Sequence, residues 1–353
     1  MKSLIGFIAA LLGTGFAILF LRKLAAPLGL IDRPGGRKHH DLPIPLVGGL
    51  AMFVALVGTA IALGMGISAA YFLLALAVIV VVGVLDGTND LKPIPKFAAQ
   101  MAACLIMIFG AGVQLKTVGN LIGFGSIGLS VLSIPLSIFA VVGVINAVNM
   151  MDGMDGLVGS LSLIAVVAYA AVAALSGLEN QFNVLVILAG ALVAYLYFNM
   201  RYSTQPRATV FMGDAGSMLL GFTFAWFAID LTHGPGRTFP PICALWVILL
   251  PLADTVSLIA RRLAKGKSPF AADREHIHHL LRVSGLSYGQ TVLALALVSV
   301  LFAMVGIAGW LWGVPQPVLF WVFFVLFFAY HFAVKAAWKK LAARDPQTVF
   351  STY

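Results

Sequence analysis

The sequence predicts an all-α protein that crosses a membrane many times. Of its 353 residues, 61% are hydrophobic and only 10% are charged, and the mean hydropathy is +1.02. A soluble globular chain carries about 25% charged residues. About eleven apolar segments reach the roughly 20 residues that a helix needs to cross the hydrocarbon core of a bilayer. Because no long hydrophilic insertion separates these segments, we expect residues 1–353 to form one integral membrane domain.

The expected spans follow one another along the chain. They are residues 3–21, 47–66, 69–86, 97–115, 128–147, 157–176, 182–199, 215–232, 240–260, 291–312 and 317–336. The first segment has the hydrophobicity of a signal peptide, but it is long, and Arg22 and Lys23 follow it at once. We therefore expect it to be retained as a membrane anchor.

The basic residues predict how the chain lies in the membrane. Of the 22 lysines and arginines, all except Lys2, Lys116 and Arg237 fall in alternate connections or in the C-terminal tail. Lysine and arginine accumulate in cytoplasmic loops, so we expect the N-terminus outside and the C-terminus in the cytosol. This placement beside membrane spans also accounts for the net charge of +9, and we expect no nucleic-acid partner.

The acidic residues follow the same division, although the distribution of lysine and arginine does not require it. Most lie in cytosolic connections or at cytosolic ends of spans: Asp32, Asp41, Asp86, Asp90, Asp152, Asp155, Asp214, Asp254, Asp273, Glu275 and Asp345. Ionisable groups in membrane segments are costly and commonly mark functional sites. The polar chemistry of this chain is therefore expected on one face of the membrane.

The central polar stretch is NAVNMMDGMDG at residues 146–156, between two uncharged apolar runs. Asp152 and Asp155 are three residues apart, and one helical turn would place both on the same face. Gly153 and Gly156 have no side chains, so a ligand could approach the backbone there. The alternative is a turn at the membrane surface with two solvated acids.

Two clusters precede this stretch. The loop at residues 32–49 is rich in proline, glycine and basic residues, Lys38 among them, and it suits either anionic lipid headgroups or a bound phosphate. The second cluster begins with Asp86, at the end of an uncharged span, and ends with Lys96. Carboxylates followed by lysines suit a site that holds a divalent cation together with phosphate oxygens.

The sequence FMGDAGS at residues 211–217 begins a later span. One interpretation is that Asp214 caps this helix, with Ser217 at the third helical position. A cap would not need glycine on both sides, and this arrangement favours a ligand or metal close to the backbone. Mg²⁺ takes one or two carboxylates and keeps positions open for water or substrate phosphate.

The longest cytosolic loop, residues 261–282, carries His276, His278 and His279 among several arginines and lysines. A zinc site is one alternative, but the loop lacks further well-spaced ligands. Surface charge without a function is another. A basic clamp for phosphates agrees with the carboxylates elsewhere, and together they predict phosphoryl transfer between a charged cytosolic substrate and a lipid.

In their order and spacing, the motifs at 146–156, 211–217 and 273–279 resemble those of the polyprenyl-phosphate N-acetylhexosamine-1-phosphate transferases. The chain is most similar to the bacterial undecaprenyl-phosphate N-acetylglucosaminyl-1-phosphate transferases of the WecA and TagO type. The resemblance covers roughly residues 25–300. It implies an enzyme in the bacterial inner membrane, with its active site on the cytosolic face. UDP-N-acetylglucosamine and undecaprenyl phosphate would give undecaprenyl-diphosphate-N-acetylglucosamine and UMP, in the first membrane step of a cell-surface polysaccharide.

The resemblance also implies roles for individual residues. Asp214 matches the ligand of Mg²⁺, with Mn²⁺ as the alternative ion, and Asp86 matches a candidate base or metal neighbour. The residues that match catalytic or substrate-binding positions near the nucleotide, the metal and the phosphates are Asn149, Asp152, Asp155, Lys38, Lys96, Arg262, His276, His278 and His279.

One position departs from the family pattern. Gly87 stands where the family usually has a second aspartate next to Asp86, which puts any mechanism that requires both acids in doubt. Asp90 is a candidate for partial replacement. Two other functions stay open: the same reaction with another UDP-N-acetylhexosamine, and a transporter. Polar groups at one face rather than at the bilayer midplane disfavour the transporter. A homodimer is compatible with the sequence.

Overall fold

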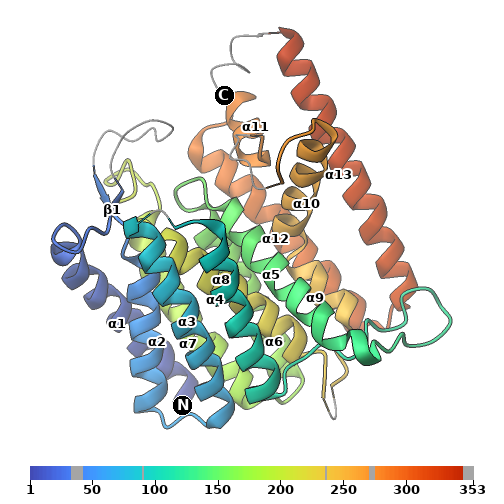
Figure 1. Cartoon of the computed structure of the whole chain (residues 1–353), viewed down its shortest axis with the longest axis horizontal. Helices are drawn as coiled ribbons and strands as arrows, with labels where there is room; N and C mark the ends of the chain where they lie inside the picture. Colours follow the sequence, from blue (N-terminus) through green and yellow to red (C-terminus); the bar gives the residue numbers. More distant parts are fainter. Residues whose placement is uncertain (33–42, 90, 235–236, 270–274, 345–353) are drawn as a thin grey trace.

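The computed structural model describes residues 1–32, 43–89, 91–234, 237–269 and 275–344. This part of the chain is a bundle of helices with one short two-stranded ribbon (Figure 1). Lys38 and Asp90 lie outside the described residues, so the roles expected for them stay predictions.

Helices account for most of the described chain. In order they are α1 Lys2–Leu24, α2 Gly48–Ala62, α3 Ile67–Asn89, α4 Pro93–Leu105 with the π-helical turn Ile106–Gly110, the 3₁₀ turn Ser130–Leu132, α5 Ser133–Met151, α6 Leu157–Leu175, α7 Glu179–Asn199, α8 Gly213–Asp230, α9 Pro241–Val247, α10 Leu249–Ala264, α11 Ile277–Val283, α12 Tyr288–Leu311 and α13 Gln316–Arg344. Strands β1 (Ile31–Asp32) and β2 (Ile44–Pro45) pair antiparallel.

The described chain is that of a polytopic membrane protein. Each of the eleven expected segments contains a helix. By length and hydropathy, eight described helices can cross a membrane, or nine if the bent pair α9 and α10 counts as one span. That pair is bent by 82°, and Pro251 lacks the N–H that would continue the hydrogen-bond ladder across the break. α2 is shorter, with 15 residues, and α8 is also not among these helices, so the eleven full spans that we expected are not all present by this criterion.

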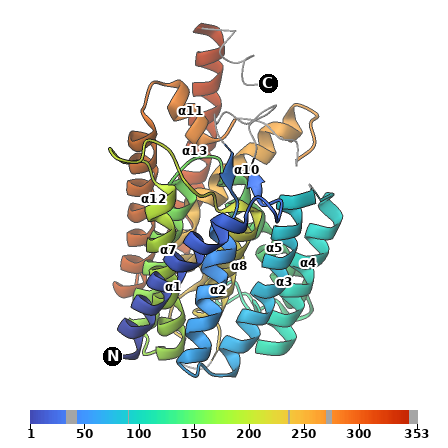
Figure 2. The same ribbon diagram turned by 90° about the vertical axis from the view of Figure 1, so that its left-hand side faces the viewer.

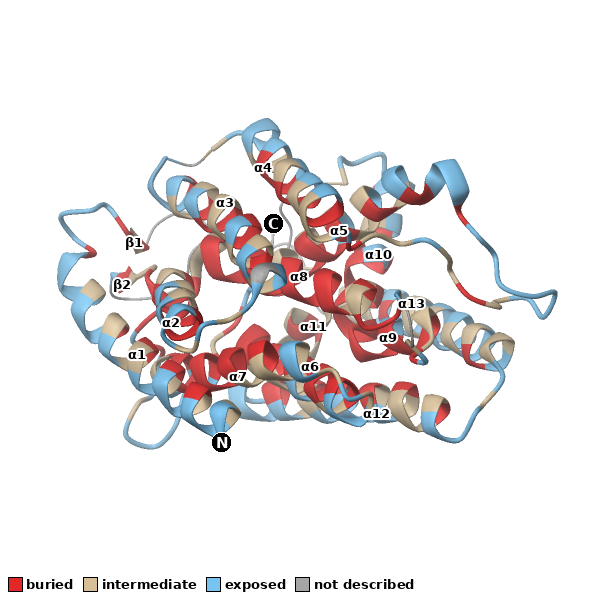
Figure 3. Ribbon diagram, turned by 90° about the horizontal axis from the view of Figure 1, so that it is seen from below, coloured by how far each residue is buried: buried red, intermediate tan, exposed pale blue. Residues whose placement is uncertain are grey.

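Helix α8 lies at the centre of the bundle. Its residues from Ala215 to Phe227 are all buried, whereas α1, α3 and α4 present exposed faces outward (Figure 3). Large apolar side chains such as Phe16 and Phe109 are exposed on these outer faces, as expected where lipid replaces water. The helix that begins with the GDAGS sequence is therefore held by protein on its sides.

Glycines let two neighbouring helices approach the first turn of α8. A Cβ atom added at Gly49 of α2 would lie 2.2 Å from the backbone nitrogen of Gly216, and one added at Gly83 of α3 would lie 2.3 Å from Cα of Ala215. No side chain fits at such distances. In addition, the backbone N–H of Gly49 donates to the carbonyl of Met212 at 3.0 Å. The position of Asp214 is thus fixed by backbone packing.

The connections that carry the predicted site residues gather at one end of the bundle. α3 and α5 end there, and α4, α6 and α8 begin there. The N-terminus lies at the opposite end, while α11 lies on the same side as these connections (Figures 1 and 2). Segments more than a hundred residues apart in sequence therefore meet on one face.

Candidate active site

Four of the residues singled out from the sequence form one cluster. The Nζ atom of Lys96 contacts the carboxylate of Asp86 and lies 3.4 Å from Oδ2 of Asp214. The Nδ2 atom of Asn149 donates to Oδ1 of Asp214 at 3.2 Å and to Oγ of Ser217 at 2.9 Å. Three motifs, from the α3–α4 connection, the end of α5 and the start of α8, thus share hydrogen bonds.

The two acids of this cluster differ in their access to solvent. The side chain of Asp86 is 5% exposed, and it also accepts a hydrogen bond from the backbone N–H of Leu91 at 2.8 Å. The side chain of Asp214 is 38% exposed. Asp214 can therefore meet a ligand that arrives from outside, whereas Asp86 is held inward by Lys96.

The cap interpretation of Asp214 is wrong. Met212 is the N-cap of α8, it makes no side-chain capping bond, and Asp214 is the second residue of the helix. Gly213 has φ +68°, a left-handed conformation that favours glycine. This turn places the carboxylate at the positive end of the helix, where negative charge is stabilised.

Asp152 lies at the end of α5 and faces solvent. Neighbouring protein still removes part of the water around its carboxyl group, and this desolvation, together with the charges of Asp214 and Asp155, raises its pKa to about 7. Asp152 and Asp214 therefore lie close enough for their charges to interact. A carboxyl group of this kind can exchange a proton near neutral pH.

The expectation that Asp152 and Asp155 share a helix face is wrong. α5 ends at Met151, and the turn that follows leads into α6 through Gly156, whose φ is +76°. The carboxylate of Asp155 accepts hydrogen bonds from Nε of Arg201 at 2.6 Å and from the backbone N–H of Ala208 at 3.1 Å. Asp155 thus ties the α7–α8 connection to the central stretch.

The segment Glu275–His279, which we call the histidine loop, reaches the turn that follows α5. A Cβ atom added at Gly153 would lie 2.7 Å from Nε2 of His278, so the imidazole lies directly against this glycine. His278 is buried, and within the described residues neither of its ring nitrogens has a hydrogen-bond partner. Burial and the neighbouring histidines His279 and His276 lower the pKa of His278 well below its usual value, so it is neutral at pH 7. Buried polar groups are normally hydrogen-bonded, so this imidazole is a candidate for contact with a substrate group.

The other basic residues of this loop, and Arg262 of α10, make contacts of their own. Nδ1 of His276 lies 2.6 Å from Oδ2 of Asp254 in α10. The ring of His279 lies 4.3 Å from that of His278, and Arg262 is buried and donates to the carbonyl of Pro269 at 2.5 Å. Of these residues, His278 lies directly against the central turn.

The donor set fits Mg²⁺ better than zinc. Within the described ranges, no three His, Cys, Asp or Glu side chains are grouped so that they could hold a metal ion, which is what a closed zinc site requires. Mg²⁺ binds through one or two carboxylates and completes its shell with water or phosphate oxygens. The open carboxylate of Asp214, with Asp86 and the amide of Asn149 beside it, is a donor set of this kind.

Two residues near the site had no role assigned from the sequence. Asp254 is completely buried and binds the histidine loop. A lone acid in an apolar helix was the signal available for it. Tyr330 of α13 donates to the same carboxylate at 2.6 Å, and nothing in its own sequence neighbourhood indicated this contact.

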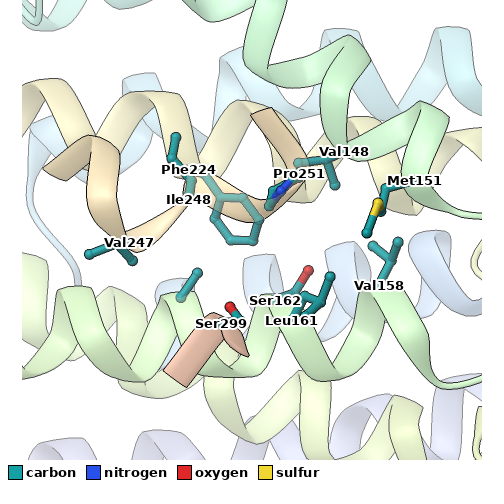
Figure 4. A pocket seen from close by; sticks show the side chains of 11 residues that line it. Val148, Met151, Val158, Leu161, Ser162, Phe224, Val247, Ile248, Pro251 and Ser299 are labelled. Atoms are coloured by element: carbon teal, nitrogen blue, oxygen red, sulfur yellow. The ribbon is translucent and has the colours of Figure 1, made fainter. Parts of the chain in front are cut away.

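A small cavity lies next to the break between α9 and α10, and its lining is mainly apolar (Figure 4). Phe224, Met151 and Pro251 contribute to its wall, and Ser162 and Ser299 are its hydroxyl groups. None of the charged residues of the cluster lines it. The cavity is therefore distinct from the polar site described above.

Comparison with known proteins relates this arrangement to a family. Residues 69–232 match the family model described as glycosyl transferase family 4. An undecaprenyl-phosphate alpha-N-acetylglucosaminyl 1-phosphate transferase of Haemophilus influenzae is 35% identical over 93% of this chain and 93% of the relative. Proteins of the same name from Pasteurella multocida and Escherichia coli strain K12 are each 36% identical, over 95% and 94% of this chain and 94% and 91% of the relatives.

Proposed function

Because this chain belongs to glycosyl transferase family 4, together with relatives that it matches over nine-tenths of their length, we propose the following reaction. The protein transfers N-acetylglucosamine 1-phosphate from UDP-N-acetylglucosamine to undecaprenyl phosphate and releases UMP. The structural observation that carries this proposal is the cluster of Asp86, Lys96, Asn149 and Asp214 at one end of the bundle. The buried, unpaired nitrogens of His278 lie against the neighbouring turn.

The reaction is a phosphoryl transfer between two charged partners. An oxygen of the lipid phosphate attacks the phosphorus that bears the sugar, and a new P–O bond forms. The bond from that phosphorus to the bridging oxygen breaks, and UMP leaves with the electron pair. Positioning and charge stabilisation supply most of the catalysis in such reactions. Lys96 provides positive charge beside Asp214, and His278 provides neutral hydrogen-bonding nitrogens.

Mg²⁺ is the proposed cofactor, with Mn²⁺ as the alternative. Asp214 would hold the ion. Asn149 would support that carboxylate directly, and Asp86 would do so through Lys96. When bound, the ion neutralises charge on the diphosphate. Asp152, with its pKa raised to about 7, is the carboxyl group best suited to exchange a proton with the lipid phosphate.

This assignment requires only one acid at the α3 terminus. Lys96 bridges Asp86 and Asp214, so the chain has a paired, oriented carboxylate there without a second aspartate. A Cβ atom at Gly87 would meet nothing closer than Leu46 Cδ1 at 3.6 Å, so packing alone does not explain why glycine stands at this position.

We also propose the cellular arrangement. The chain lies in a bacterial cytoplasmic membrane with its N-terminus outside and its C-terminus and active site in the cytosol, as the distribution of lysine and arginine favours. The site residues gather at the end opposite the N-terminus, which agrees with this orientation. The lipid-linked product would begin a cell-surface polysaccharide, and a homodimer stays a prediction.

A panel of UDP-sugars tests the reaction. Purified protein in lipid nanodiscs receives undecaprenyl phosphate, Mg²⁺ and one UDP-sugar at a time, and both UMP and the lipid product are quantified. We expect UDP-N-acetylglucosamine to be preferred and UMP to equal lipid product one to one. Release of UDP instead of UMP, or consumption of other UDP-sugars only, would contradict the proposal.

A matched pair of variants on α8 tests the site. Asp214→Asn removes the open carboxylate, whereas Asp230→Asn changes an aspartate at the opposite end of the same helix, which pairs with Arg237 and Gln181. We expect Asp214→Asn to lose turnover and Asp230→Asn to retain it. Equal activity of the two variants would rule out the proposed role of Asp214.

A further inference from the structure

We propose that Asp254 and Tyr330 are positioning residues, through which the last helix α13 holds the histidine loop (Glu275–His279) against the sugar-nucleotide site. This inference rests on the proposed function, because it assigns the loop to binding of the UDP-sugar. Neither residue touches the acid cluster in the contacts above. Both act through His276.

The carboxylate of Asp254 is the centre of this arrangement. It is completely buried, and three donors converge on it: Nδ1 of His276 at 2.6 Å, the backbone N–H of Ile277 at 3.0 Å and the hydroxyl of Tyr330 at 2.6 Å. A carboxylate only accepts hydrogen bonds, so Nδ1 of His276 must carry a proton. Asp254 thereby fixes both the orientation of the imidazole and the nitrogen, Nε2, that can face a ligand.

Helix α13 makes further polar contacts, one with α10 and one with the loop. Nδ1 of His331 lies 3.0 Å from Oγ of Ser257 in α10, and Nε1 of Trp338 donates to the carbonyl of Glu275 at 3.2 Å. Arg261 donates to the same carbonyl at 2.8 Å and to Ser257 at 2.6 Å. Most of the apolar part of α13 is not buried by the rest of the described chain, so these polar contacts add to the attachment of the helix.

The arrangement leads back to the proposed site. The rings of His276 and His278 are stacked, with centroids 5.4 Å apart and planes 13° apart. His278 in turn lies against Gly153, next to Asp152. A shift of His276 would therefore move the His278 imidazole, which lies against the central turn. Catalytic geometry is sensitive to displacements of this kind, because supporting residues hold the contacting groups in place.

Two variants perturb this arrangement to different degrees. Tyr330→Phe removes one donor from Asp254 and keeps the ring. Asp254→Asn replaces the carboxylate with an amide, whose single oxygen cannot serve three donors and whose NH₂ group would face one of them. The matched control is Tyr169→Phe, because Tyr169 is also buried and its hydroxyl donates to the carbonyl of Ala244 at 3.1 Å, between α6 and α9.

The measurement separates binding from turnover. Steady-state kinetics in nanodiscs give KM for each substrate and kcat, and calorimetry gives the Kd of UDP. For Tyr330→Phe we expect KM for UDP-N-acetylglucosamine and Kd for UDP to rise about three- to tenfold, the effect of one lost hydrogen bond of ordinary strength. We expect KM for undecaprenyl phosphate to stay unchanged and kcat to change by less than about twofold. Asp254→Asn should show a larger rise, and Tyr169→Phe none.

The inference fails if Tyr330→Phe and Tyr169→Phe both keep the KM and Kd of the wild type and both lose the same amount in Tm. That result would assign Tyr330 to stability alone. A wild-type protein that does not turn over UDP-N-acetylglucosamine contradicts the proposed function instead. In that event the Kd of UDP still tests whether Tyr330 and Asp254 position the loop.

Discussion

Replacing Gly83 with alanine should disable the enzyme although Gly83 is not part of the polar cluster. The new Cβ atom would lie 2.3 Å from Cα and 2.5 Å from the backbone nitrogen of Ala215. Ordinary van der Waals contact begins at 3.4 Å, so α3 and the first turn of α8 must separate by about 1 Å. Both contacts are to backbone, so no flexible side chain can absorb the change.

This displacement acts on the site directly, because Asp86 follows Gly83 by one helical turn and Asp214 precedes Ala215. A misplacement of about 1 Å costs on the order of a hundredfold in rate, and overpacking costs about 1–3 kcal/mol of stability. The matched control is Gly143→Ala in α5, where an added Cβ atom would meet nothing within 4 Å. That substitution should leave both the rate and Tm almost unchanged.

The assay is UMP release by folded protein in nanodiscs at saturating substrates, with Tm recorded on the same samples. We expect Gly83→Ala to lose about a hundredfold in rate while enough protein stays folded to be assayed. If Gly83→Ala were as active as Gly143→Ala, the close approach of α3 and α8 would not be what positions Asp214.

Three further outcomes follow from the site. Because the pKa of Asp152 is raised to about 7, its carboxylate form is lost as the pH falls below 7. The rate of the wild-type enzyme should therefore fall below pH 7, and the pH–rate profile of Asp152→Asn should lack this fall. Asp155→Asn should lower the free energy of unfolding by about 1–2 kcal/mol, measured by denaturation, because it weakens the contacts to Arg201 and Ala208; unchanged stability would contradict this. His278→Phe keeps an aromatic ring and removes two buried unpaired nitrogens, so Tm should stay the same or rise. The Kd for UDP should increase about tenfold. An unchanged Kd would show that His278 does not contact UDP.

The sequence predicted the convergence of the motifs because the residues involved are costly in a membrane. Asp86, Asn149 and Asp214 each lie at an end of an apolar run, and costly polar groups placed on one face indicate a shared site there. The structure places these three with Lys96 in one hydrogen-bonded cluster. Their chemical roles stay predictions, since they depend on ligands and on measurements of activity.

Local conformation was harder to predict than convergence. The spacing of Asp152 and Asp155 matches a helical turn, but Gly156 in a left-handed conformation ends that pattern, and Arg201 draws Asp155 away. A cap was one interpretation of Asp214, but Met212 is the N-cap and α8 already begins at Gly213. In both cases glycine conformation decided the outcome, and a single sequence does not reveal which glycines adopt positive φ.

Contacts between distant segments were the least predictable. Asp254 was visible as an acid in an apolar helix, but its partners come from the histidine loop and from α13. Tyr330 lies in a run of aromatic residues that suits a lipid-facing helix, and its hydroxyl contact depends on how α13 packs. The break between α9 and α10 was hidden in the same way, because its apolar residues read as one continuous span.

The most direct test is to measure Mn²⁺ binding by electron paramagnetic resonance in nanodiscs with UDP present. It asks whether the connections that carry Asp86, Asn149 and Asp214 hold one metal-bridged diphosphate. The arrangement around Asp214 predicts one bound ion per chain, lost in Asp214→Asn and retained in Asp230→Asn. Full Mn²⁺ binding by Asp214→Asn would contradict the account, whatever the activity of the enzyme.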